Sequence, residues 1–167
     1  SAMLVHMVPM LTPLGLGASA VMVGTLFGPS QVLSRFINMV FGTKLSPPML
    51  AVLSAFFMSS GIGVLMLSGQ WLPGAIAFAV LLGLGSGINS IVQGSLPLWL
   101  FGSEGYGTVT GKMAAMRLVL SATAPFAFAI MSESAGTSAA LAVTASLGAL
   151  AMLGFLAIWR GTVSGNR

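Results

Sequence analysis

Long apolar runs separated by short polar gaps divide this chain of 167 residues into five segments that are each long enough to cross a lipid bilayer. A spanning helix needs about 20 residues. Runs of that length predict helices at residues 18–41, 48–68, 72–98, 112–131 and 138–159. Membrane strands would alternate apolar and polar positions over about 10 residues, and these runs do not alternate. The pattern therefore predicts an all-α, polytopic transmembrane helix bundle that forms one membrane domain.

The gaps between the runs are short and rich in turn-forming residues. They are predicted at residues 42–43, 69–70, 102–107 and 134–136. A further apolar stretch, residues 3–12, is too short to span a bilayer. We expect it to be the end of a helix that begins upstream, in a longer protein.

The composition excludes a water-soluble domain. Apolar residues make up 56% of the chain, charged residues make up 5%, and the mean hydropathy is +1.03, whereas soluble domains carry about 25% charged residues. The net charge of +4 does not indicate nucleic-acid binding, because the basic residues flank apolar runs and do not cluster in sequence. With no cysteine, the chain has neither disulfides nor a thiolate metal site.

The basic residues occur in or beside every second gap, which predicts an orientation. Lys44 lies between the first two runs, Lys112 and Arg117 begin the fourth, and Arg160 and Arg167 follow the fifth. Lys and Arg concentrate in the cytoplasmic loops of membrane proteins. We therefore expect these places, and the carboxyl terminus, to be cytoplasmic.

Motifs of enzyme chemistry are incomplete in this sequence. Residues 15–20 (GLGASA) match a dinucleotide fingerprint, but no strand is predicted before them and no acidic residue follows at the ribose distance. Residues 107–112 (GTVTGK) are one residue too short for a phosphate-binding loop. With a single histidine, no catalytic residue, cofactor or metal is predicted, and we expect the protein not to be an enzyme.

Polar side chains gather on one face of each of two predicted helices. In the third run Ser86, Asn89, Ser90 and Gln93 recur at offsets of three and four residues, which places them on one helical face. Such a stripe faces either a water-filled pathway or a polar face of another helix. Both interpretations remain open.

The first run repeats this arrangement. Its polar face comprises Gln31, Ser34, Arg35 and Asn38, and Pro29 before them removes a backbone donor and permits a kink. Arg35 either lines a pathway or extends to the cytoplasmic surface.

The fourth run carries Arg117 and Ser121 on one face, with Pro125 in mid-helix. Small-residue spacings that let helices approach closely occur in two of the five runs. These residues are Gly24, Gly28, Gly83 and Gly87.

These residues resemble the carboxyl-terminal half of a major facilitator superfamily transporter. Residues 6–16 (HMVPMLTPLGL) resemble the outer end of the seventh helix and the turn that follows it. Residues 41–45 (FGTKL) stand where the second copy of the family's cytoplasmic loop belongs, with Thr43 in place of the acid and Lys44 in place of the arginine. Residues 82–87 and 100–112, which include Glu104 and Lys112, resemble the tenth helix and its cytoplasmic exit.

The resemblance implies a secondary active transporter of a small molecule that works by alternating access in the bacterial inner membrane, with an amino-terminal half supplied upstream. Helices seven, eight, ten and eleven of such a protein face the cavity. The two polar-faced runs and the fourth run correspond to three of these helices. Carboxamides would then bind substrate, and Arg35 or Arg117 would attract an anion or close the cytoplasmic gate. The alternative is a non-transporting integral membrane subunit whose polar helix faces dock onto other helices.

Overall fold

The computed structural model describes residue 11 and residues 19–42, 45–68 and 71–164. Most of these residues are helical, and no strand occurs among them. Five helices follow one another: α3 (Ser19–Phe41), α4 (Pro47–Ser68), α5 (Leu72–Phe101), α6 (Tyr106–Ala135) and α7 (Thr137–Ser164). The all-α class is confirmed.

Four of the five helices, α4 to α7, are long and apolar enough to cross a membrane. They indicate an integral membrane protein whose apolar helices suit contact with lipid. The α3 helix has 23 residues, which is sufficient length, but it is not apolar enough to be counted with the others. Its polar face, which includes Gln31 and Arg35, accounts for the difference. Of the five predicted spans, the four that correspond to α4, α5, α6 and α7 are therefore confirmed as long and apolar enough to cross a membrane.

The helices α5, α6 and α7 are longer than predicted. The α6 helix begins at Tyr106, six residues before the expected start, because only residues 102–105 connect it to α5. Gly102 and Gly105 have positive φ angles of 72° and 71°, a conformation that glycine adopts without steric cost. The predicted gap at 102–107 was thus too long. The gap at 134–136 was also too long, since α6 continues to Ala135.

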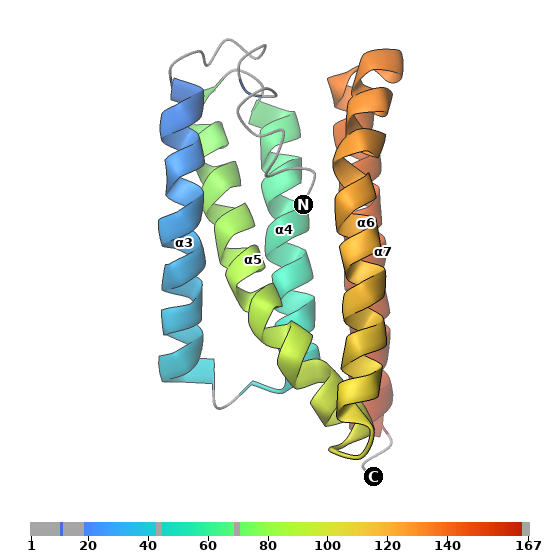
Figure 1. The fold of residues 1–167 in the computed structure, drawn as a ribbon. Helices are drawn as coiled ribbons and strands as arrows, with labels where there is room; N and C mark the ends of the chain where they lie inside the picture. The colour runs from blue at the N-terminus through green and yellow to red at the C-terminus, as the bar shows by residue number, and fades with distance from the viewer. Residues whose placement is uncertain (1–10, 12–18, 43–44, 69–70, 165–167) are drawn as a thin grey trace.

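The helices run alternately up and down, so the carboxyl ends of α3, α5 and α7 meet the amino ends of α4 and α6 at one end of the bundle (Figure 1). Arg35, Lys112 and Arg160 each lie within two turns of that end, which we call the basic end. Glu133 lies in the last turn of α6, at the opposite end.

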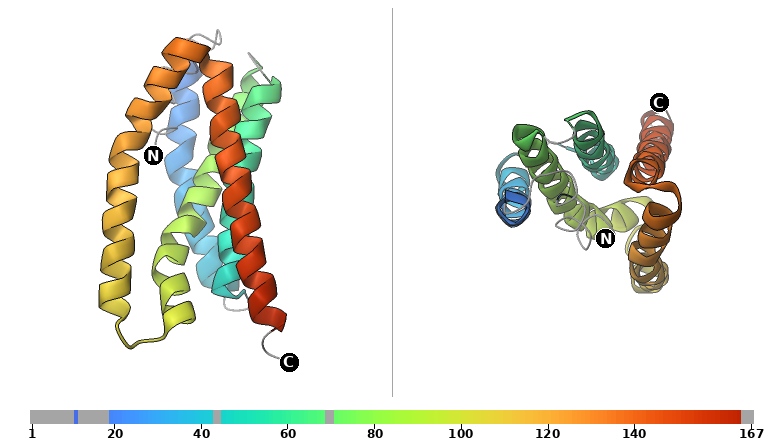
Figure 2. Two further views of the ribbon diagram at one scale, coloured as in Figure 1. Left: turned by 90° about the vertical axis from the view of Figure 1, so that its right-hand side faces the viewer. Right: turned by 90° about the horizontal axis from the view of Figure 1, so that it is seen from above.

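Seen along the bundle, α4 and α7 lie together on one side, while α3, α5 and α6 form the other (Figure 2). The α5 helix packs on both α3 and α4, and α7 packs on α4 and α6. The α5 helix starts beside α3 and crosses toward α6 on its way to the basic end (Figure 1). Consequently α3 and α5 diverge toward the basic end.

The larger hydrophobic core lies away from the basic end and draws on all five helices. Its largest fully buried side chain in the described helices is Phe78 of α5, which packs among Val23, Leu65 and Leu82. A second cluster joins α4 to α5 and comprises Leu50, Ala51, Ile88, Val92 and Leu96. The α6 and α7 helices take little part in the core, since only 6% of the most apolar window of each is buried.

Candidate functional site

Two glycines of α5 bring this helix against α3. A Cβ atom at Gly83 would lie 2.6 Å from the carbonyl oxygen of Phe27 and 2.7 Å from Cβ of Ser30. A Cβ atom at Gly87 would lie 2.5 Å from the carbonyl oxygen of Gln31 and would collide with the hydroxyl of Ser34. Real Cβ atoms do not approach so closely, so only glycine permits this contact. We call the contact the α3–α5 seam.

The seam pairs the two polar faces predicted from the sequence. Gln31 Nε2 donates a hydrogen bond of 3.0 Å to Ser86 Oγ. One turn further, Arg35 Nε donates a hydrogen bond of 3.1 Å to Ser90 Oγ. Both bonds join residues 55 apart in sequence, so α3 and α5 run parallel in a constant register.

The next step of this register pairs Asn38 with Gln93, but no hydrogen bond joins them. The α3 and α5 helices diverge toward the basic end (Figure 1). Within the described residues, neither of these side chains nor that of Asn89 makes any hydrogen bond. Gln93 is exposed, and Asn38 and Asn89 are half-buried. The polar faces therefore carry both side chains that bond across the seam and three carboxamides, those of Asn38, Asn89 and Gln93, that do not.

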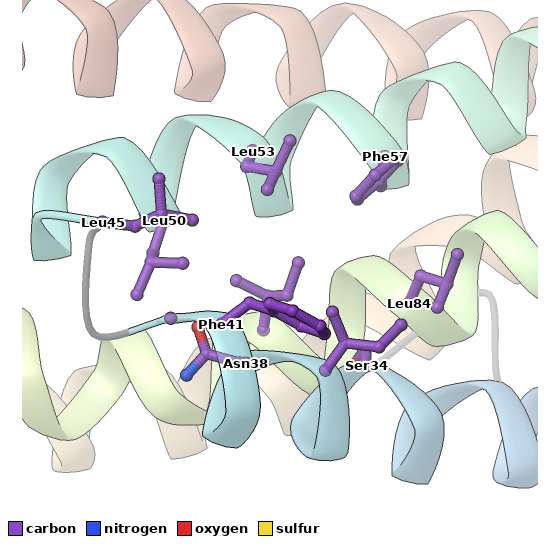
Figure 3. A pocket seen from close by; sticks show the side chains of 11 residues that line it. Ser34, Asn38, Phe41, Leu45, Leu50, Leu53, Phe57 and Leu84 are labelled. Carbon is purple, nitrogen blue, oxygen red and sulfur yellow. The ribbon is translucent and has the colours of Figure 1, made fainter.

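An apolar cavity of about 210 Å³ lies where α3 and α5 diverge, with α4 as its third wall (Figure 3). Ser34 and Asn38 of α3 are the polar side chains that line it. Its apolar lining includes Leu50, Leu53, Phe57, Leu84 and Ile88. Of the residues predicted for a substrate pathway, only Asn38 lines this cavity. Sequence reasoning missed the apolar lining, because leucine and phenylalanine are ordinary in a chain of this composition.

The predicted residues of the fourth run lie on α6, apart from the seam. Arg117 and Ser121 line a wide hollow of about 440 Å³ together with Met113, Met116 and Leu120. Arg117 is exposed and forms no ion pair with any described residue. The α6 helix runs through Pro125 without interruption and bends toward its carboxyl end (Figure 2). The missing amide hydrogen of Pro125 accounts for such a bend.

The predicted loop residues and packing residues are only partly described. Thr43 and Lys44 lie outside the described residues, as do His6 and all of residues 6–16 except Leu11. Glu104 lies in the connection between α5 and α6, Lys112 lies in the second turn of α6, and both are exposed.

The close helix approach expected at Gly28 is not found, because an added Cβ atom there would meet nothing within 4 Å. Gly24 is half-buried and Pro29 is exposed, and α3 continues through both to Phe41. The close approach at the seam is thus made by Gly83 and Gly87 of α5, whereas Gly28 of α3 takes no part in it.

No group of three or more His, Cys, Asp or Glu side chains that could hold a metal ion occurs among the described residues. The site is therefore made of amides, hydroxyls and one guanidinium on two apolar helices. Comparisons with protein-family models, with curated proteins and with solved structures found no match.

Proposed function

We propose that the chain is the carboxyl-terminal half of a secondary transporter of the major facilitator type, which moves a small molecule by alternating access. The observation that carries this proposal is the set of unbonded carboxamides on the two polar faces. Asn38, Asn89 and Gln93 present carboxamides without hydrogen-bond partners among the described residues.

An unsatisfied amide inside a membrane is costly, because lipid offers no hydrogen bonds. Water or a polar substrate in a pathway between two halves would satisfy these groups. The arrangement of the helices supports this interpretation, since α3, α5 and α6 form one side of the bundle while α4 and α7 form the other (Figure 2). In the proposed transporter, the first group faces the missing amino-terminal half and the second faces lipid.

The proposed roles follow from these positions. Gln31, Asn89 and Gln93 offer hydrogen bonds to the substrate in the pathway, and Ser86 and Ser90 hold the α3 side chains in place. Four residues that lie in sequence between α3 and α4, between α5 and α6, and early in α6 act in the cytoplasmic gate, in a protein of the bacterial inner membrane with a cytoplasmic carboxyl terminus. These gate residues are Thr43, Lys44, Glu104 and Lys112.

Cysteine labelling in membranes tests the proposal, because the chain contains no cysteine of its own. In the full-length protein, Asn89→Cys and Gln93→Cys should react with a membrane-impermeant thiol reagent. Val92→Cys is the matched control, because Val92 lies on the same helix but is only 4% exposed. Alternating access further predicts reaction from either side of the membrane. Unreactive cysteines at 89 and 93 would overturn the proposal.

A second candidate is a non-transporting subunit that docks onto other helices. Its support comes from α6, where the most apolar window is only 6% buried and Met116, Leu118 and Phe126 are exposed. In such a subunit, partner helices would cover the polar faces. Cysteines at 89 and 93 would then stay unreactive, and they would become reactive once the partner was removed.

A further inference from the structure

We propose that Arg35 binds an oxyanion, a carboxylate or a phosphate, carried by the transported molecule. This inference rests on the proposed function and adds a substrate class to it. It starts from the way in which the guanidinium is held at the α3–α5 seam and from the charges that surround it.

A single hydrogen bond fixes the Arg35 side chain against α5. Its Nε donates to Ser90 Oγ at 3.1 Å, and the Ser90 hydroxyl in turn donates to the carbonyl oxygen of Gly87 at 2.7 Å. The serine is thus oriented by its own backbone contact and presents a lone pair to the arginine. A guanidinium has five N–H donors. The four on its two terminal nitrogens find no acceptor among the described residues.

This geometry differs from that of an arginine that only reaches for the membrane surface. Arg35 lies six residues before the end of α3, about 9 Å from that end at 1.5 Å per residue. The bond to Ser90 holds the side chain across the seam, and Ser90 itself lies eleven residues, about 16 Å, before the end of α5. Arg35 is nevertheless exposed.

Among the described residues, no carboxylate forms an ion pair with Arg35. It has two acidic residues in total. Glu104 lies in the α5–α6 connection, and Glu133 lies in the last turn of α6 at the far end of the bundle. Neither forms an ion pair with any described residue. The polar side chains that share the face with Arg35 are neutral amides and hydroxyls, so an anion meets donors there and no opposing negative charge.

The N–H donors of the Arg35 guanidinium favour an oxyanion as the ligand. The planar guanidinium offers parallel N–H groups that match two oxygens of a carboxylate or phosphate. The carboxamides of Asn89 and Gln93, within three residues of Ser90 on the neighbouring helix, add neutral donors that suit the remaining polar groups of the same molecule. A cationic substrate would instead meet the Arg35 charge without compensation.

An oxyanion could also belong to a phospholipid headgroup, and the test separates the two sources. The full-length protein is placed in nanodiscs of neutral lipid, and thermal unfolding is followed by tryptophan fluorescence at constant ionic strength. The probes are inorganic phosphate and succinate, with glycerol as the uncharged control. We expect at least one anion to raise the unfolding midpoint by about 5 °C or more at about a hundred times its Kd.

Two variants and one control assign the effect to Arg35. Arg35→Gln should lose the shift, and Ser90→Ala, which keeps the charge but removes its anchor, should weaken anion binding several-fold. Arg160→Gln, at the end of α7, should keep the full shift. The assignment is overturned if no anion raises the midpoint, if Arg35→Gln keeps the shift, or if Arg160→Gln loses it.

Phosphatidylglycerol nanodiscs form the second arm. A rise in the midpoint that requires phosphatidylglycerol and is absent with the soluble anions would assign Arg35 to lipid and overturn its assignment to substrate. Failure of this inference is distinguishable from failure of the proposed function. If the cysteines at 89 and 93 react but no soluble anion shifts the midpoint, the proposed pathway is supported and the proposal of an anionic substrate is refuted.

Discussion

Replacing Gly83 by alanine should separate α3 from α5. The new Cβ atom would lie 2.6 Å from the carbonyl oxygen of Phe27, a backbone atom that cannot rotate away. An ordinary contact needs about 3.5 Å, so the helices must move apart by about 0.9 Å at this level. The Gln31–Ser86 hydrogen bond, now 3.0 Å, would then stretch to about 3.9 Å and be lost.

The expected cost combines two terms. Overpacking costs about 1–3 kcal/mol, and a hydrogen bond between membrane helices contributes about 0.6 kcal/mol on average. The better helix propensity of alanine offsets up to about 1 kcal/mol of this sum. We therefore expect Gly83→Ala to lower the free energy of unfolding by about 1–3 kcal/mol.

The measurement is unfolding by sodium dodecyl sulfate in mixed micelles, followed by near-ultraviolet circular dichroism. Gly28→Ala is the matched control, because a Cβ atom at Gly28 on the facing helix meets nothing within 4 Å. This variant should be as stable as the parent protein, or slightly more stable. Equal stability of Gly83→Ala and Gly28→Ala would refute the close approach at the seam.

Two further predictions concern α4 and the α5–α6 connection. Ser54 donates a 2.9 Å hydrogen bond to the carbonyl oxygen of Gly85, whereas the buried hydroxyl of Ser59 has no hydrogen-bond partner among the described residues. Ser54→Ala should thus cost about 0.6–1.7 kcal/mol in the same unfolding assay while Ser59→Ala costs nothing, and a loss for Ser59→Ala alone would contradict the assignment. Gly105→Ala should cost about 1–2 kcal/mol, because its φ of 71° is left-handed, and Gly107→Ala, inside α6, serves as the unstrained control.

The number of helices, their order and the residues that share a polar face were predictable from the sequence. These properties depend on local periodicity, which a membrane imposes strictly. Helix ends were less predictable: Gly107 and Gly111 resemble loop residues, but α6 includes both. Within a membrane the backbone has to satisfy its own hydrogen bonds, so a helix continues past glycines that would end it in water.

The candidate site was predictable only in part. The polar faces of α3 and α5 were expected, but their alignment was not, because register depends on tertiary packing. The difference between Gly83, which meets α3, and Gly28, which meets nothing, is likewise invisible in the sequence spacing. The apolar cavity beside Asn38 could not be predicted from the sequence, since the leucine and phenylalanine residues that line it are common throughout the chain.

The parallel register of α3 and α5 has a consequence for biogenesis. Gln31 and Arg35 emerge from the ribosome 55 residues before the serines that bind them, an interval of about 3–11 s at roughly 5–20 residues per second. During that interval α3, which is not apolar enough to be counted with the four candidate spans, has no polar neighbour from α5. The insertion machinery must therefore keep α3 away from lipid until α4 and α5 have been inserted. Substitution of Ser86 and Ser90 should delay the release of α3 into lipid.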